Sequence, residues 1–183
     1  MKKIIQLQFP KKIENGNVGN GDPELDPDDP ASISSQIIIL NELFLGCETT
    51  DGHKALKRCV AKKRLGYKSQ DVANEIFDAK WFVTLDEILG LLVASKLQCH
   101  YCRKGCAIKY SKPLLGSQWT LDRICNDQGH NRQNVVISCL NCNLRRGVRS
   151  SRNYKLGQQM KFIKTHNSTY DEEQATATNC LNN

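Results

Sequence analysis

Apolar residues are scarce in the first part of the chain and then recur at helical spacing. Residues 1–35 contain mostly turn formers and acids with little to bury, so they are predicted to be a disordered lead-in. The segment 36–45 predicts a short helix that ends at Gly46. The β-branched run 37–39 leaves a strand as the alternative there.

Three signals for the start of a helix follow. Asp51 can cap a helix that runs to Gly66, and Ser69 can cap the next one. Thr84-Leu-Asp-Glu87 is a capping box, in which each end satisfies a backbone N–H of the other, and it opens a third helix. Residues 36–98 are therefore predicted to be a helical region.

Beyond position 98 the pattern changes to alternating apolar and polar positions. Residues 118–125 and 134–138 predict two short strands, joined by a loop at 126–132. A Cys-x-x-Cys turn, here called a cysteine knuckle, precedes the strands, and a second one follows them at the start of a further helix. The fold class is therefore α+β. Residues 155–183 are predicted to be a helix end and a flexible tail.

The two cysteine knuckles predict a metal site. Two Cys-x-x-Cys pairs bring four thiolates within reach of one tetrahedral zinc ion with a structural role. The four ligands are Cys99, Cys102, Cys139 and Cys142. The remaining cysteines of the nine are scattered, and among them Cys106 could replace Cys102 as a ligand.

Composition and charge narrow the class of partner. No apolar run approaches the roughly 20 residues that cross a bilayer, so we expect an intracellular protein, cytoplasmic or nuclear, with no membrane partner. The net charge is +7 overall, but residues 99–152 alone hold ten Lys and Arg against two Asp and Glu, a net +8. A field concentrated in this way favours a nucleic acid as partner. A basic face kept for solubility is the alternative.

Three motifs inside this basic segment occur in a particular order. Leu-Asp-Arg-Ile at 121–124 is followed by Gly-His-Asn-x-x-Asn-Val-Val at 129–136 and by Ser-Cys-x-x-Cys-Asn-x-x-Arg at 138–146. Together they resemble the HNH endonuclease family, most of all the variants encoded by phages, large DNA viruses and mobile elements. The resemblance implies a small ββα-metal module over residues 99–154. It also implies a metal-dependent endonuclease that hydrolyses DNA phosphodiester bonds, with RNA a less favoured substrate.

The resemblance also implies roles for single residues. Asp122 would be the acidic ligand of a catalytic cation, and Asn143 the second ligand. Asn134 would brace the loop by hydrogen bonds. Oxygen ligands suit Mg²⁺ or Mn²⁺, so the catalytic ion would be distinct from the structural zinc.

One position departs from the family pattern. Arg123 stands where the family usually has a histidine that acts as the general base. Arginine stays protonated, so Arg123 is expected to bind the scissile phosphate rather than to take a proton. Water activation would then fall to the metal, to His130 in the loop, or to a substrate phosphate; a turn or phosphate contact is the other interpretation of His130.

Basic side chains of the loop and of the last predicted helix are expected to contact DNA phosphates. These residues are Arg132, Arg145, Arg146, Arg149 and Arg152. A solvated helix face is the alternative. Because Arg123 replaces the usual base, a catalytically inactive, zinc-stabilised DNA- or RNA-binding module is the second functional hypothesis, and a zinc finger for protein contacts is the third.

Overall fold

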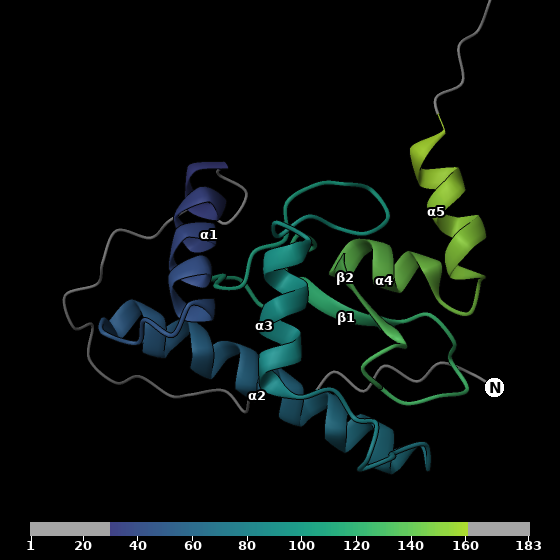
Figure 1. Cartoon of the computed structure of the whole chain (residues 1–183). Coiled ribbons are helices and arrows are strands. Elements are labelled where there is room, and N and C mark those ends of the chain that lie inside the picture. The colour runs from purple at the N-terminus through teal and green to yellow at the C-terminus, as the bar shows by residue number, and fades with distance from the viewer. Residues whose placement is uncertain (1–29, 161–183) are drawn as a thin grey trace, which may run out of the picture.

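The computed structural model describes residues 30–160 and has an α+β fold (Figure 1). Residues 1–29 and 161–183, which include most of the predicted lead-in and tail, lie outside the described residues. The elements in chain order are α1 (Pro30–Phe44), α2 (Asp51–Ala73), α3 (Leu85–Ala94), β1 (Trp119–Arg123), β2 (Val135–Cys139), α4 (Leu140–Arg146) and α5 (Ser151–Gln159). Among the described residues, no helix combines the length and apolar character that crossing a bilayer requires.

The first helix begins earlier than the sequence pattern indicated. It starts at Pro30 rather than at residue 36, so residues 30–35 are helical and not part of a lead-in, and the strand alternative at 37–39 is wrong. Proline suits the first turn because its fixed φ matches a helix and its missing N–H is not needed there. Gln36 also fixes this helix, since its Oε1 accepts the backbone N–H groups of Ile108 (2.8 Å) and Lys109 (2.9 Å).

The two helices predicted between Asp51 and residue 77 are one continuous helix, α2. Thr50 rather than Asp51 is the N-cap, and its side chain accepts the backbone N–H of His53. Ser69 does not cap, because its hydroxyl donates to the Leu65 carbonyl one turn earlier (3.2 Å). Buried residues on both sides of Gly66 continue one packed face, which outweighs the cost of about 1 kcal/mol of glycine in a helix.

The capping box at the start of α3 is confirmed. The Thr84 hydroxyl accepts the Glu87 N–H (3.2 Å), and the Glu87 carboxylate accepts the Thr84 N–H (2.8 Å). Val83 and Ile88, which flank the box, are fully buried. This local signal therefore identified the start of the helix correctly.

The two strands form an antiparallel hairpin with Trp119 opposite Cys139 and Arg123 opposite Val135. One hydrophobic cluster joins this hairpin to α1, α2 and α3, and it includes Leu92 of α3 and Ile137 of β2. In Figure 1 the three helices lie on one side of the hairpin, with α4 and α5 on the other. The helical region and the cysteine-bounded module therefore share a core.

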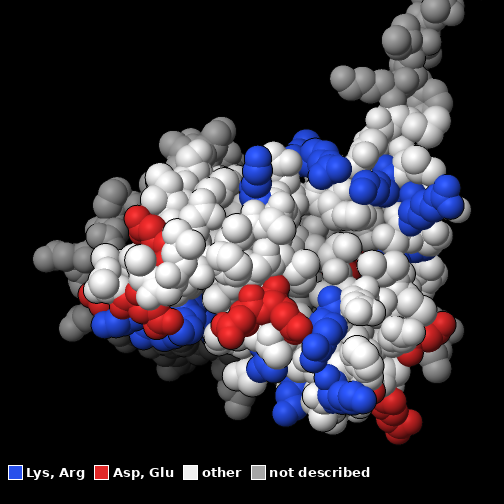
Figure 2. Space-filling model, viewed as in Figure 1, with Lys and Arg blue, Asp and Glu red and all other residues white. Residues whose placement is uncertain are grey.

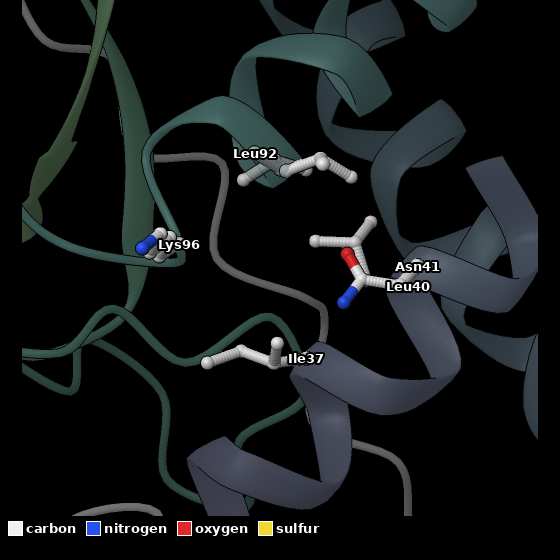
Figure 3. A pocket seen from close by; sticks show the side chains of 6 residues that line it. Ile37, Leu40, Asn41, Leu92 and Lys96 are labelled. Atoms are coloured by element: carbon white, nitrogen blue, oxygen red, sulfur yellow. The ribbon is translucent and has the colours of Figure 1, made fainter.

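A cavity of about 320 Å³ lies between α1 and α3 (Figure 3). Its lining is apolar apart from Asn41 and Lys96. It offers no cluster of acids, bases or metal ligands, so the candidate functional site lies elsewhere.

Lys63 links α2 to the start of β1. Its amine donates to Gln118 Oε1 (3.2 Å) and to the Trp119 carbonyl, and it lies 4.9 Å from the centre of the Trp119 ring. Burial lowers the pKa of Lys63 from 10.5 to about 7.

This depressed pKa predicts a pH dependence of stability. Between about pH 7 and 10.5 the unfolded chain binds more protons at Lys63 than the folded one, so the free energy of unfolding should rise with pH. Between about pH 7 and 9 we expect the zinc-loaded protein to gain on the order of 1 kcal/mol relative to Lys63→Met. Urea unfolding at both pH values measures this, and parallel pH profiles for the two proteins would contradict it.

Candidate metal centre and hairpin site

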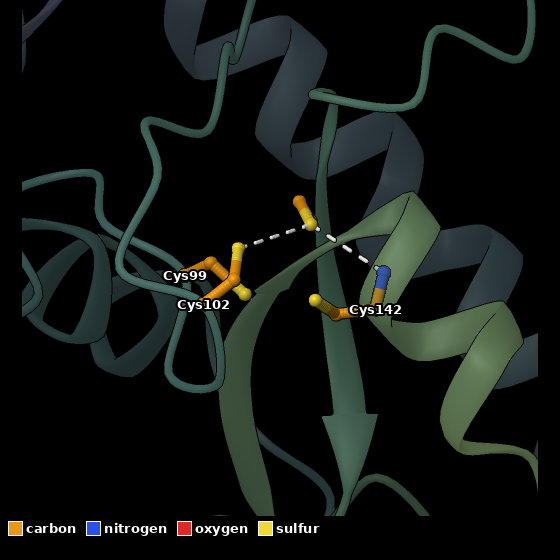
Figure 4. Close-up of side chains that lie close together, drawn as sticks. Cys99, Cys102 and Cys142 are labelled. Atoms are coloured by element: carbon orange, nitrogen blue, oxygen red, sulfur yellow. Dashed lines mark hydrogen bonds between the residues drawn. The ribbon is translucent and has the colours of Figure 1, made fainter. Parts of the chain in front are cut away.

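The four predicted zinc ligands converge at one end of the hairpin (Figure 4). Their sulfur atoms all lie within 4.8 Å of one another, and Cys102 Sγ lies 3.9 Å from Cys139 Sγ. Thiolates placed 2.3 Å from one tetrahedral zinc ion would be about 3.8 Å apart. Among the described residues Cys106 is not part of this group, so the four sulfurs fit a zinc ion with the predicted ligand set.

Local backbone geometry shapes each knuckle. In the first, the Cys99 N–H donates to the Lys104 carbonyl (2.8 Å), and Arg103 has a positive φ that tightens the turn. In the second, Cys139 is the N-cap of α4, and its sulfur accepts the Cys142 N–H (3.4 Å). Burial raises the pKa of Cys142 to about 12, so a cation is needed to hold this thiol deprotonated at neutral pH.

Asp122 is buried at the end of β1 and pairs with Arg146 of α4. Its two carboxylate oxygens accept Arg146 Nε (2.6 Å) and Nη2 (2.9 Å), and Oδ2 also accepts the Tyr101 hydroxyl (2.6 Å). Both Asp122 and Arg146 are 1% exposed. Two parallel charge-assisted hydrogen bonds make this a strong pair at a buried site.

The prediction that Arg146 contacts DNA phosphates is therefore wrong. Its guanidinium also donates to the carbonyls of Arg123 and Arg149 (2.7 Å for Arg149), which joins the hairpin to the turn after α4. The sequence contained one signal for this role, since Arg146 follows Asn143 by three residues and so shares its helix face. No sequence signal indicated the Tyr101 contact.

Asn143 of α4 contacts the two residues of β1 that precede Asp122. Its Nδ2 donates to Thr120 Oγ1 (3.1 Å) and to the Leu121 carbonyl (3.5 Å). The donor chemistry of a carboxylate and an amide oxygen fits Mg²⁺ or Mn²⁺. A divalent ion would compete with Arg146 for the carboxylate, because Arg146 engages both of its oxygens.

Asn134 makes the hydrogen bonds expected of a loop brace. Its Nδ2 donates to the carbonyls of Cys125 (2.9 Å) and Gly129 (3.0 Å), and its Oδ1 accepts the Cys125 N–H (2.8 Å). The side chain is buried. Both ends of the loop between β1 and β2 are thus held by one residue.

His130 belongs to the same loop, is buried and is bound to Asp71 of α2. The Asp71 carboxylate accepts the His130 backbone N–H (2.6 Å) and lies 2.7 Å from Nδ1, and the imidazole packs 4.5 Å from the Tyr67 ring. Burial lowers the pKa of His130. At 4% exposure His130 suits anchoring of the turn better than activation of water. No sequence signal indicated Asp71 as the partner of His130.

The contact between Asp71 and the His130 turn requires glycine at position 129. A Cβ there would lie 2.6 Å from the Ile76 carbonyl oxygen and 2.8 Å from Asp71 Oδ2. We expect Gly129→Ala to lower the free energy of unfolding by about 2 kcal/mol, because backbone or the buried Asp71 must move. Gly66→Ala is the matched control: nothing lies within 4 Å of its Cβ, so it should gain about 0.5–1 kcal/mol. Urea unfolding of both variants measures this, and a stable Gly129→Ala would contradict the described contact.

The remaining predicted arginines do not lie on one helix. Helix α4 ends at Gly147, which has a positive φ, and Ser150 caps the separate helix α5. All four arginines are exposed. Arg145 lies in α4, Arg149 in the turn after it, Arg152 in α5 and Arg132 in the hairpin loop. Arg123 is half-buried, and its guanidinium donates to the Gln128 carbonyl (3.3 Å). Figure 2 shows basic side chains near α4 and α5 and a second group near the hairpin loop.

Comparisons with known proteins add no assignment to this geometry. No protein-family model matches the chain, and no curated protein or solved structure matches it. The functional argument therefore depends on the residues and distances described above.

Proposed function

We propose that this protein is an endonuclease of the HNH type that hydrolyses DNA, with its catalytic hairpin held by a structural zinc ion. The observation that carries the proposal is the position of the motif residues along a hairpin that ends at a four-sulfur centre. Asn143 on α4 hydrogen-bonds to Thr120 and Leu121, the two residues of β1 that precede Asp122, and Asn134 braces the hairpin loop.

Each residue has a defined part in this proposal. Asp122 and Asn143 would hold a Mg²⁺ or Mn²⁺ ion, which when bound polarises a phosphate and lowers the pKa of a coordinated water. Arg123, at the end of β1, would stabilise the charge that develops on the scissile phosphate. Arg146 orients the Asp122 carboxylate through two hydrogen bonds until a divalent ion competes for it.

The exposed arginines supply the DNA contacts. They lie in the hairpin loop, in α4, in the turn after it and in α5, and each contact to a phosphate releases a condensed counterion. Binding should therefore weaken steeply as salt concentration rises. Arg146 is excluded from this set because its side chain is buried.

A second candidate is a zinc-stabilised nucleic-acid-binding module without hydrolysis. The Asp122–Arg146 pair favours it, because the guanidinium supplies the positive charge that the carboxylate would otherwise take from a metal ion. The replacement of the usual base by Arg123 favours it as well. This candidate predicts salt-dependent binding with no cleavage.

One experiment separates the two candidates. Zinc-loaded protein is incubated with duplex DNA and with RNA of the same sequence, with Mn²⁺ present or omitted, so that no chelator disturbs the zinc site. The proposal expects cleavage of DNA only when Mn²⁺ is present. Salt-dependent binding to DNA without any cleavage in Mn²⁺ or Mg²⁺ would favour the second candidate instead.

A further inference from the structure

Trp81 is an exposed aromatic residue beside the hairpin loop. It lies in the segment between α2 and α3, and 43% of its surface is exposed. The other tryptophan of the chain, Trp119, is fully buried in the core. An indole left open to solvent next to cationic side chains is available for contact with a partner.

Two cations flank the Trp81 ring. Lys80 Nζ and the Arg132 guanidinium carbon each lie 5.6 Å from its centre. Arg132 comes from the hairpin loop, and Lys80 is the neighbour of Trp81 in the chain. We call these three residues the tryptophan platform. Figure 2 shows basic side chains gathered between the start of α3 and the hairpin loop.

Hydrogen bonds fix the backbone of the platform and the Arg132 side chain before any partner binds. The Arg132 N–H donates to the Trp81 carbonyl (3.0 Å), and Arg132 Nη2 donates to the Lys80 carbonyl (3.1 Å). The Asp78 carboxylate accepts the backbone N–H groups of Lys80 (2.9 Å) and Trp81 (3.3 Å). Arg132 also pairs with Glu87 (3.5 Å), which fixes the guanidinium further. The backbone of the platform and Arg132 therefore lose little conformational entropy on binding.

We propose that the tryptophan platform stacks on an unpaired base, so that the protein prefers DNA with a single-stranded or branched segment over plain duplex. Every base has a π face that an indole can cover, and two adjacent cations match the phosphates on either side of it. Both cations favour a polyanion over an apolar protein surface. The inference depends on the proposed function only in that the partner is DNA.

Binding measurements on three variants test the platform. The probes are a single-stranded oligo(dT) and a blunt duplex, each titrated with zinc-loaded protein. Trp81→Leu keeps an apolar side chain but removes the ring, so binding to oligo(dT) should weaken about 5- to 150-fold, with duplex binding changed less than about twofold. Trp81→Phe should stay within about threefold of the parent. Phe44→Leu is the matched control, since Phe44 is 51% exposed on α1, and it should bind like the parent.

Tryptophan fluorescence provides a second readout that does not require Trp81→Leu to fold. Oligo(dT) should quench the parent, and it should not quench Trp81→Phe, in which only the buried Trp119 remains. Three results would overturn the proposed role of the platform. They are unchanged binding of oligo(dT) to Trp81→Leu, equal weakening of duplex and single-strand binding in that variant, or no quenching of the parent's fluorescence by oligo(dT). A parent that binds and cuts duplex but ignores oligo(dT) would overturn it and leave the proposed function intact. A parent that neither binds nor cuts any DNA would contradict both the platform and the proposed function.

Discussion

Loss of one zinc ligand is expected to unfold the hairpin and its flanking helices. Zinc bound by four thiolates contributes on the order of 10 kcal/mol to folding, which is comparable to the whole stability of a small domain. We expect the parent to hold one zinc ion per chain, and Cys102→Ser to lose it together with its cooperative thermal transition. Zinc content and circular dichroism of the purified proteins measure both effects.

The choice of Cys102 and of its control follows from the structure. Cys102 is half-buried and caps no helix, whereas Cys139 is also the N-cap of α4. Cys125→Ser is the matched control, because Cys125 is exposed and lies outside the four-sulfur group. It should keep its zinc and its melting temperature. Retention of zinc and stability by Cys102→Ser would place the metal elsewhere.

Manganese should rescue a variant in which Asp122 has lost its arginine. Arg146→Gln leaves the buried carboxylate without its main partner, which should cost about 3–5 kcal/mol. If Asp122 and Asn143 hold a divalent ion, Mn²⁺ should then bind without competition. At 100 times its dissociation constant it would return about 2.7 kcal/mol of stability.

Thermal melting of zinc-saturated protein with and without Mn²⁺ measures this rescue. The melting temperature of Arg146→Gln should rise more than that of the parent. The double variant Asp122→Asn, Arg146→Gln is the control, because removing both charges should restore much of the stability and abolish the response to Mn²⁺. Equal responses of all three proteins would mean that Asp122 does not hold the ion.

The parts of the fold that local sequence determines were predictable. The capping box at Thr84, the alternation within each strand and the spacing within each cysteine pair depend on residues close together in the chain. The structure has all three features. The brace role of Asn134 followed from the resemblance to a known family, and its hydrogen bonds fit that role.

Features that depend on contacts between distant segments were not predictable. Asp71 lies 59 positions before His130, and nothing in the α2 sequence indicates that this acid turns inward. Helix α2 continues past Gly66 because its buried face packs against the core, a contact that local propensity does not contain. Arg146 belongs to a run of arginines and shares a helix face with Asn143, but its burial, unlike the exposure of its neighbour Arg145, depends on the packing of α4 on β1.

These contacts also change how the catalytic hypothesis can be tested. Asp122→Ala alone would leave the Arg146 guanidinium buried without its carboxylate, and a loss of activity could then follow from unfolding. The double variant Asp122→Asn, Arg146→Gln removes the metal ligand and the unpaired charge together. It is therefore the appropriate inactive form of the protein.

Cleavage of duplex DNA in Mn²⁺ by the zinc-loaded parent and by this double variant tests the central claim most directly. We predict that the parent cuts only when Mn²⁺ or Mg²⁺ is added, and that the folded double variant cuts at least about 100-fold more slowly, because several kcal/mol of transition-state stabilisation is lost. A zinc-loaded parent that binds DNA and never cuts it, or a double variant that cuts as fast as the parent, would contradict the assignment.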